Sequence, residues 1–221
     1  MRRLLVLRPE PGAGATAGRA LELGFEVAAV PLFEVEPIDW AVPDPADFDG
    51  LLLTSANAVR HGGIELQVLL PLPVFAVGEA TAEAALKAGF KVIMTGGAGV
   101  DGLLGSIEPN VRLLHLTGED RREPSGARQL ITTLAVYRSR AIERPDLSAA
   151  PGSVAVIHSP RAGRRFAELV KDHGSVAIVA ISPTAAEAVG GGWESIAVAG
   201  KPTDEALLAL AASLCNKPAP E

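Results

Sequence analysis

The chain has 221 residues, of which 48% are hydrophobic, and its 20 basic and 26 acidic residues give a formal net charge of −6. This length allows one large core or two small ones, and the acidic balance argues against nucleic-acid binding, which needs a basic surface. One cysteine excludes internal disulfides and cysteine-rich zinc sites, and the four histidines show no metal-ligand spacing, so we expect neither a metal nor a cofactor.

The first ten residues, MRRLLVLRPE, contain only four consecutive apolar residues, which is typical of a strand rather than of a signal peptide. No segment reaches the roughly 18 apolar residues that a membrane helix requires. We therefore expect a cytoplasmic protein with no membrane partner.

Short apolar runs alternate with Ala/Leu-rich helical patterns along most of the chain. Ten runs are predicted as strands: 4–7, 26–30, 50–54, 73–77, 91–95, 112–116, 133–138, 154–158, 177–181 and 195–199. Continuous runs of this kind, separated by helices, indicate parallel strands that are buried on both faces. Ten strands are too many for one compact doubly wound sheet, so we predict two α/β domains with about five strands each.

The first loop candidate, PGAGATAG (11–18), contains a Gly-x-Gly-x-x-Ala pattern, and Glu34 lies about twenty residues beyond it. This pattern is similar to a dinucleotide-binding fingerprint and raises the possibility of a nucleotide-dependent enzyme. Two prolines separate the glycines from the preceding strand, however, which favours a flexible loop before a helix. The same interpretation applies to GGAGVDG (96–102).

Two segments are typical of linkers. The stretch 33–45 combines three prolines with four acidic residues, and 135–147 carries a run of charges that ends in a proline. This shift in composition indicates that the chain leaves one domain and later returns to it.

Small hydroxyl residues stand where several predicted strands become helices. These junctions are Thr54-Ser55, Gly78 to Thr81, Ser159 and Ser182-Pro183-Thr184. Junctions of this kind line the carboxyl edge of a parallel sheet, where free N–H groups and the helix dipole attract carboxylate or phosphate. The simpler alternative is that each hydroxyl is an ordinary helix N-cap.

Basic residues lie near the same strand ends: Arg8, Arg121-Arg122, and Arg161, Arg164 and Arg165. In an acidic chain they could steer a polyanionic ligand and pair with its carboxylates, or they could form a solvated helix face. Tyr137, the sole tyrosine, lies in the second linker. Its hydroxyl either sits at the rim of a packed ring or faces a cleft and donates a hydrogen bond to a leaving group.

The sequence also shows internal similarity. At a shift of 104 residues LLLTSANAVR falls on AVIHSPRAGR, and FAVGEATAEA falls on VAISPTAAEA; at a shift of 109, residues 3–10 resemble 112–119. We interpret this as a duplication.

The order of these signals resembles the uroporphyrinogen-III synthase family over essentially the whole chain. The matching pieces are Arg8-Pro9, PLFEVEP, LLLTSANAV, VGEATAEAALKAGF, LTGEDRRE, AVYR, IHSPRAGRRF, ISPTAAEAVG and AGKPTDEALL. The resemblance implies two α/β domains of doubly wound parallel (flavodoxin-like) type, joined by a two-stranded β-ladder, with a cleft between them. It assigns 1–34 and 142–221 to a discontinuous first domain, 39–134 to the second, and 35–38 and 135–141 to the ladder.

The resemblance further implies an enzyme, a lyase of porphyrin biosynthesis. It would cyclise hydroxymethylbilane, a linear tetrapyrrole with eight carboxylates, to uroporphyrinogen III with inversion of the last ring. Tyr137 matches a cleft tyrosine proposed to assist departure of the hydroxyl. The matched or expected substrate-binding positions are Arg8, Thr54, Ser55, Gly78, Thr81, Arg122, Ser159, Ser182 and Thr184.

Two positions depart from the family pattern: Ala185 replaces an expected threonine, and His158 stands where a threonine is common. We expect a monomer whose only partner is the small-molecule substrate. The alternative function is a two-domain small-molecule binding protein without catalysis, which would bind ligand tightly without turnover.

Overall fold

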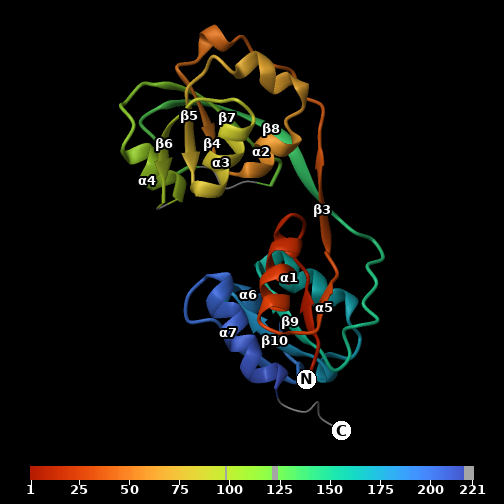
Figure 1. Cartoon of the computed structure of the whole chain (residues 1–221). Coiled ribbons are helices and arrows are strands. Elements are labelled where there is room, and N and C mark those ends of the chain that lie inside the picture. The colour runs from red at the N-terminus through yellow and green to blue at the C-terminus, as the bar shows by residue number, and fades with distance from the viewer. Residues whose placement is uncertain (98, 121–123, 217–221) are drawn as a thin grey trace. The chain divides into compact units, whose positions relative to one another are not determined.

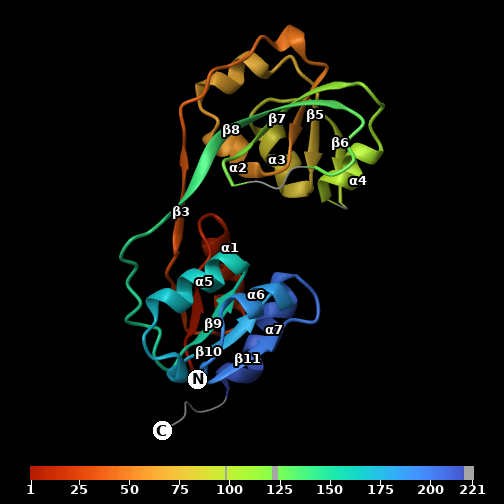
Figure 2. The ribbon, with the colours of Figure 1, turned by 180° about the vertical axis from the view of Figure 1, so that it is seen from behind.

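The structure is a computed structural model that describes residues 1–97, 99–120 and 124–216. The chain divides into two compact units (Figures 1 and 2). The first unit consists of Met1–Glu34 and Ala141–Glu221, and the second consists of Val35–Arg140.

The first unit is built on a five-stranded sheet in the order β11-β10-β9-β1-β2, and all of its neighbouring strands are parallel. Its strands are β1 (Leu4–Val6), β2 (Val27–Ala29), β9 (Val154–Ile157), β10 (Ala177–Ala180) and β11 (Ser195–Val198). Its helices are α1 (Gly12–Glu22), α5 (Pro160–Leu169), α6 (Pro183–Ala188) and α7 (Asp204–Cys215), with a 3-10 turn at His173–Ser175.

Alternate residues of the interior strands serve different cores in this unit. Leu5 and Leu7 pack with α5 and α6, whereas Leu4 and Val6 pack with α1 and α7. Because successive side chains of a strand point to opposite faces, an unbroken apolar strand requires helices on both faces. The first unit is therefore doubly wound.

The second unit contains a six-stranded sheet in the order β3-β8-β7-β4-β5-β6. The strands are β3 (Phe33–Pro37), β4 (Gly50–Leu53), β5 (Val74–Val77), β6 (Val92–Gly96), β7 (Arg112–Gly118) and β8 (Leu130–Ala141). The helices are α2 (Ala56–His61), α3 (Glu79–Lys87) and α4 (Gly99–Gly105), with 3-10 segments at Pro45–Asp47 and Ile64–Leu69. Leu51 and Leu53 pack with α2 and α3, and Leu52 packs with α4.

Strands β3 and β8 are neighbours, and each continues across the division between the units. The Ile38 N–H donates to the Val136 carbonyl at 3.2 Å, and the Ile142 N–H donates to the Leu32 carbonyl at 2.9 Å. Residue numbers rise along β3 where those of its partner β8 fall, so the two strands are antiparallel. The predicted fold class, two parallel-sheet α/β domains joined by a two-stranded ladder, is confirmed.

The two sheets repeat one spatial pattern. Strands β11, β10, β9 and β1 occupy the positions in the first sheet that β6, β5, β4 and β7 occupy in the second. The first three pairs are separated by about 104 residues, the shift at which the sequence superposes, and the β1/β7 pair by about 109. The repeat is therefore circularly permuted in one half.

The composition of the glycine-rich stretch 11–18 predicts a flexible loop, and this prediction is wrong. Gly12–Glu22 is helix α1, and Ala13, Thr16 and Ala20 face the core. Packing against the sheet outweighs the poor helix propensity of glycine here. The stretch 96–102 is predicted as loop for the same reason; Gly96 ends β6, residues 99–102 belong to helix α4 (Gly99–Gly105), and Ala98 lies outside the described residues.

Within the described ranges, no helix is both long and apolar enough to cross a membrane.

Candidate active site

Three neighbouring strands of the first unit, β10, β9 and β1, end beside one another and deliver the predicted junctions to one edge. The Ser159 hydroxyl accepts a hydrogen bond from the Ala162 N–H at 3.1 Å and caps α5. The Ser182 hydroxyl accepts from the Ala185 N–H at 3.3 Å and lies 3.0 Å from the Thr184 hydroxyl. Both serines are N-caps. The Ser159 hydroxyl keeps its own hydrogen and a second lone pair for a ligand, whereas the Ser182 hydroxyl uses one of these in its hydrogen bond with Thr184.

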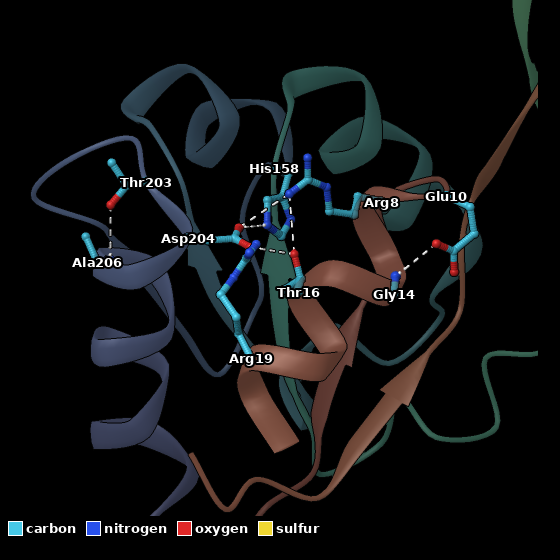
Figure 3. A network of polar contacts seen from close by, with 9 residues as sticks. All are labelled: Arg8, Glu10, Gly14, Thr16, Arg19, His158, Thr203, Asp204 and Ala206. Atoms are coloured by element: carbon cyan, nitrogen blue, oxygen red, sulfur yellow. Dashed lines mark hydrogen bonds and ion pairs between the residues drawn. The ribbon is translucent and has the colours of Figure 1, made fainter. Parts of the chain in front are cut away.

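Arg8, just after β1, belongs to a polar network centred on the Asp204 carboxylate (Figure 3). Asp204 accepts hydrogen bonds from the Thr16 hydroxyl at 2.6 Å and the His158 Nε2 at 2.8 Å. The guanidinium groups of Arg19 and Arg8 also pair with it, Arg8 at 3.4 Å. Asp204 thus connects the ends of β1 and β9 with helices α1 and α7.

Burial and hydrogen bonding together set the charges in this network. The side chains of Asp204 and His158 are 9% and 7% exposed. Hydrogen bonds from Thr16, Arg19 and His158 outweigh burial and lower the pKa of Asp204 to about 2.

Burial, aided by the positive charge of Arg8, lowers the pKa of His158 below its usual value of 6.5 despite its bond to Asp204. At neutral pH the imidazole is uncharged and donates from Nε2, because a carboxylate can only accept. Two arginines, Arg8 and Arg19, pair with the one carboxylate of Asp204. Arg8, 34% exposed, is placed to offer its charge to an anion.

In the second unit, four neighbouring strands, β8, β7, β4 and β5, bring together the remaining described positions. The Thr54 hydroxyl, just after β4, lies 3.0 Å from Nε2 of His115, a buried residue of β7. The Ser55 hydroxyl accepts from the Asn57 N–H at 3.2 Å and caps α2. His115 therefore fixes the orientation of Thr54.

Gly78 follows β5 and precedes α3 with φ 82° and ψ 150°. This conformation is one that only glycine adopts readily, although a side chain there would meet no atom within 4 Å. Thr81 is 5% exposed and lies on the buried face of α3. The Gly78 N–H donates to the Gly96 carbonyl at 2.8 Å, so the first-turn backbone of α3 just beyond Gly78 is better placed than the buried Thr81 hydroxyl to meet a ligand.

Tyr137 lies in β8, half-buried against the core of the second unit. Its ring packs over Gly118, the last residue of β7, and its centroid is 6.2 Å from that of His61. Within the part of the chain that the structure describes, its hydroxyl makes no hydrogen bond. A phenol in this state can donate to a ligand.

The structure thus gathers the predicted positions at one sheet edge in each unit, while Arg122, like Arg121, lies outside the described residues. Sequence reasoning missed Asp204, His115, His61 and Gly118. A histidine inside the apolar run RLLHL was a visible signal for His115. Asp204 had the ordinary pattern of an acidic residue in the first turn of a helix.

Ala185, one of the two departures from the family pattern, is fully buried where α5 and α6 meet. A side chain on Gly163 of α5 would come within 3.1 Å of the Ala185 carbonyl, so the helices approach closely here. A small residue at 185 fits this packing.

The sequence matches the family model described as uroporphyrinogen-III synthase HemD over residues 14–209. A search of curated proteins gave no significant match. The crystal structure of uroporphyrinogen-III synthetase from Helicobacter pylori 26695 is similar at a TM-score of 0.69 and 20% identity, covering 97% of this chain and 100% of that chain. A mutant uroporphyrinogen III synthase from the extremely thermophilic bacterium Thermus thermophilus is similar at a TM-score of 0.53 and 18% identity, covering 98% and 100%. At these identities the structural likeness concerns the fold.

Proposed function

Because the chain belongs to the uroporphyrinogen-III synthase family, we propose that it cyclises hydroxymethylbilane to uroporphyrinogen III with inversion of the last pyrrole ring. The observation that carries this function is the family match over residues 14–209, which takes in most of both units. Membership of a family of cyclising lyases does not favour the alternative of a binding protein without catalysis.

The reaction needs little from side chains. The C–O bond of the hydroxymethyl group breaks, and the hydroxyl takes a proton and leaves as water, which gives an azafulvene cation. Attack by the substituted carbon of the last ring forms a spiro intermediate, which fragments and recombines with that ring inverted. The last ring then loses a proton, so the proton taken at the start is returned. The protein chiefly holds the chain in the one folding mode that allows this attack.

Tyr137 is the residue we propose for hydroxyl departure. The residue is half-buried and its hydroxyl has no hydrogen-bond partner among the described residues, so it is free to donate to the departing oxygen. The proton released from the last ring would restore the phenol.

We propose that the substrate carboxylates are bound at the strand ends by the positions that the family resemblance names. Arg8 supports this role, because it is partly exposed and shares the Asp204 carboxylate with a second arginine, Arg19. The first-turn N–H groups of α3 beyond Gly78 and the capping hydroxyls of Ser55, Ser159 and Ser182 would supply further donors. Thr54, Thr81, Thr184 and Arg122 complete the proposed set.

Freshly prepared hydroxymethylbilane tests the function directly. Purified protein should convert it mainly to the type III isomer, measured by chromatographic separation of the products, whereas heat-denatured protein should give the uninverted type I isomer. Type I product alone from the native protein would contradict the proposal.

We also propose that the protein acts as a monomer in the cytoplasm. Both units supply proposed site residues from one chain, so a second copy is not needed to complete the set. Light scattering should give a mass near 22.8 kDa. A mass twice as large would contradict the monomer, and recovery in a membrane fraction would contradict the location.

A further inference from the structure

The pairing of β7 with β8 changes register at the end of β7. From Arg112 to Thr117 the partners advance one for one, and Thr117 faces Ala135. Gly118 then faces Tyr137, so Val136 is the extra residue of a β-bulge. Without this slip, Gly118 would face Val136, and the tyrosine side chain would point to the other face of the sheet.

Gly118 leaves the space that the tyrosine ring fills. A Cβ atom at this position would lie 2.7 Å from Cε2, 2.9 Å from Cζ and 3.2 Å from Oη of Tyr137. The first two distances are shorter than real Cβ contacts, so any larger residue must displace the reactive end of the ring. No positive φ accompanies Gly118, and its backbone conformation is therefore open to other residues. Close approach, rather than backbone conformation, is what requires glycine here.

His61, at the end of α2, contacts the same ring from another element. Its imidazole plane is tilted by 40° to the phenol. Burial lowers the pKa of His61, and the charge of the adjacent Arg60 acts in the same direction, so the ring beside the phenol is uncharged near neutral pH. The phenol ring of Tyr137 therefore lies against Gly118, and the uncharged imidazole of His61 is near it.

We propose that Gly118 is a positioning residue for the synthase reaction, which together with the bulge at Val136 sets where the Tyr137 hydroxyl meets the departing oxygen. This inference rests on the proposed role of Tyr137. Proton transfer requires donor and acceptor within hydrogen-bond reach, and a displacement of about 1 Å can cost up to about 100-fold in rate.

The test compares Gly118→Ala with Gly105→Ala in the wild-type and Tyr137→Phe backgrounds. Gly105 is a matched control, because it lies in the same unit and has no atom within 4 Å of an added Cβ. Gly118→Ala should lower kcat about 10- to 100-fold, with KM within about twofold and a larger share of type I product. In the Tyr137→Phe background the same change should alter kcat by less than about twofold. Gly105→Ala should leave both constants within about twofold.

Tyr137 is the sole tyrosine, so it also offers a readout that does not depend on activity. Protein labelled with 3-fluorotyrosine should show ¹⁹F signals from this ring alone, displaced from the position of the free amino acid. Gly118→Ala should shift them, and Gly105→Ala should not. If Gly118→Ala fails to fold, the wild-type spectrum still decides: a signal at the position of free 3-fluorotyrosine overturns the proposal.

The outcomes separate this proposal from the role of Tyr137. If Tyr137→Phe slows turnover but Gly118→Ala does not, the positioning role alone is overturned. If Gly118→Ala costs the same in both backgrounds, it acts through the fold rather than through the hydroxyl, which also overturns it. If Tyr137→Phe retains full activity, the proposed role of the tyrosine fails and the positioning role fails with it, while conversion to type III would still support the enzyme function.

Discussion

At the scale of single residues, Asp204 does the most to hold one edge of the first unit together. It receives donors from α1 and from the ends of β1 and β9 while lying in the first turn of α7. An acidic group at a helix N-terminus is favourable in itself, and its arginine partners add to this. Its removal should therefore loosen several elements at once.

The first prediction concerns Asp204→Asn. The folded-state pKa of Asp204, about 2, is below its ordinary value of 3.8, so its ionised form contributes stability above pH 4 that is lost as the pH falls toward 2. We expect the variant to unfold about 1 to 2 kcal/mol more easily in urea at pH 7, allowing for the partly exposed arginines. Its stability should also change less between pH 4 and 2.

Asp49→Asn is the control for that measurement. The pKa of Asp49 is likewise lowered to about 2 by Arg112, but this ion pair is exposed. Exposed pairs contribute little to stability, so the unfolding midpoint should hardly move. Equal losses in the two variants would contradict the importance we give to the Asp204 network.

The second prediction concerns His158. Its charged form is a cation whereas that of Asp204 is an anion, but in both cases stability should fall as the pH falls. Its folded pKa lies below 6.5, so protonation favours the unfolded chain, and stability should fall as the pH drops below about 6.5. His158→Gln keeps a donor for Asp204 without a titrating ring and should flatten the change in urea midpoint between pH 7 and pH 5. An unchanged slope would show that other groups control this range.

At the scale of elements, the sequence predicts which residues cap the helices but not which of them bind substrate. A small hydroxyl residue that follows a strand predicts a helix N-cap. Four helices begin in this way, at Ser55, Ser159, Ser182 and Thr203. Their position at the carboxyl edge follows from strand direction alone. Whether they also bind substrate does not, because one residue type serves both purposes.

The third prediction separates these purposes at Ser159. Ser159→Ala removes the cap of α5 and should destabilise the protein by about 1 kcal/mol, whereas Ser159→Asn retains a capping oxygen and should cost only a few tenths. Denaturant midpoints measure this difference. If KM rises in both variants, the hydroxyl contacts substrate; if it rises only with alanine, the residue acts through the helix.

Strands were more predictable than loops. All ten apolar runs are strands, because a sequence buried on both faces has few alternatives. The eleventh, β3, has the composition of a linker and was implied only by the family resemblance; pairing with β8 makes it a strand. The contacts of Gly118 and His61 with Tyr137 depend on a one-residue slip and a close approach, neither of which leaves a local pattern.

At the scale of the whole molecule, each unit has its own pair of cores. The clusters around Leu5 and Leu4 belong to the first unit, and those around Leu51 and Leu52 to the second. Units with separate cores can unfold separately, and each unit then has its own unfolding free energy.

The fourth prediction follows from this separation. Ile178→Ala in the first unit and Leu114→Ala in the second both remove fully buried side chains and should each cost about 2 to 5 kcal/mol. In calorimetry each variant should lower the temperature of a different transition. A single transition shifted equally by both would show that the two units unfold as one.

The insertion of the second unit between the two parts of the first has a consequence for synthesis. Strand β1 pairs with β9 from Leu4 to Val154, which closes a loop of about 150 residues if the chain between them is unstructured. The second unit is continuous and is complete once β8 has left the ribosome, before β9 exists. Its folding, with the β3/β8 pairing, brings Leu32 and Ile142 together and shortens the remaining loop to about 40 residues.

That shortening lowers the entropic cost of closing the first sheet by about 1 kcal/mol. An insert that folds early thus holds together the segments on either side of it. The permuted order of the strands along the chain therefore favours folding of the second unit before the first.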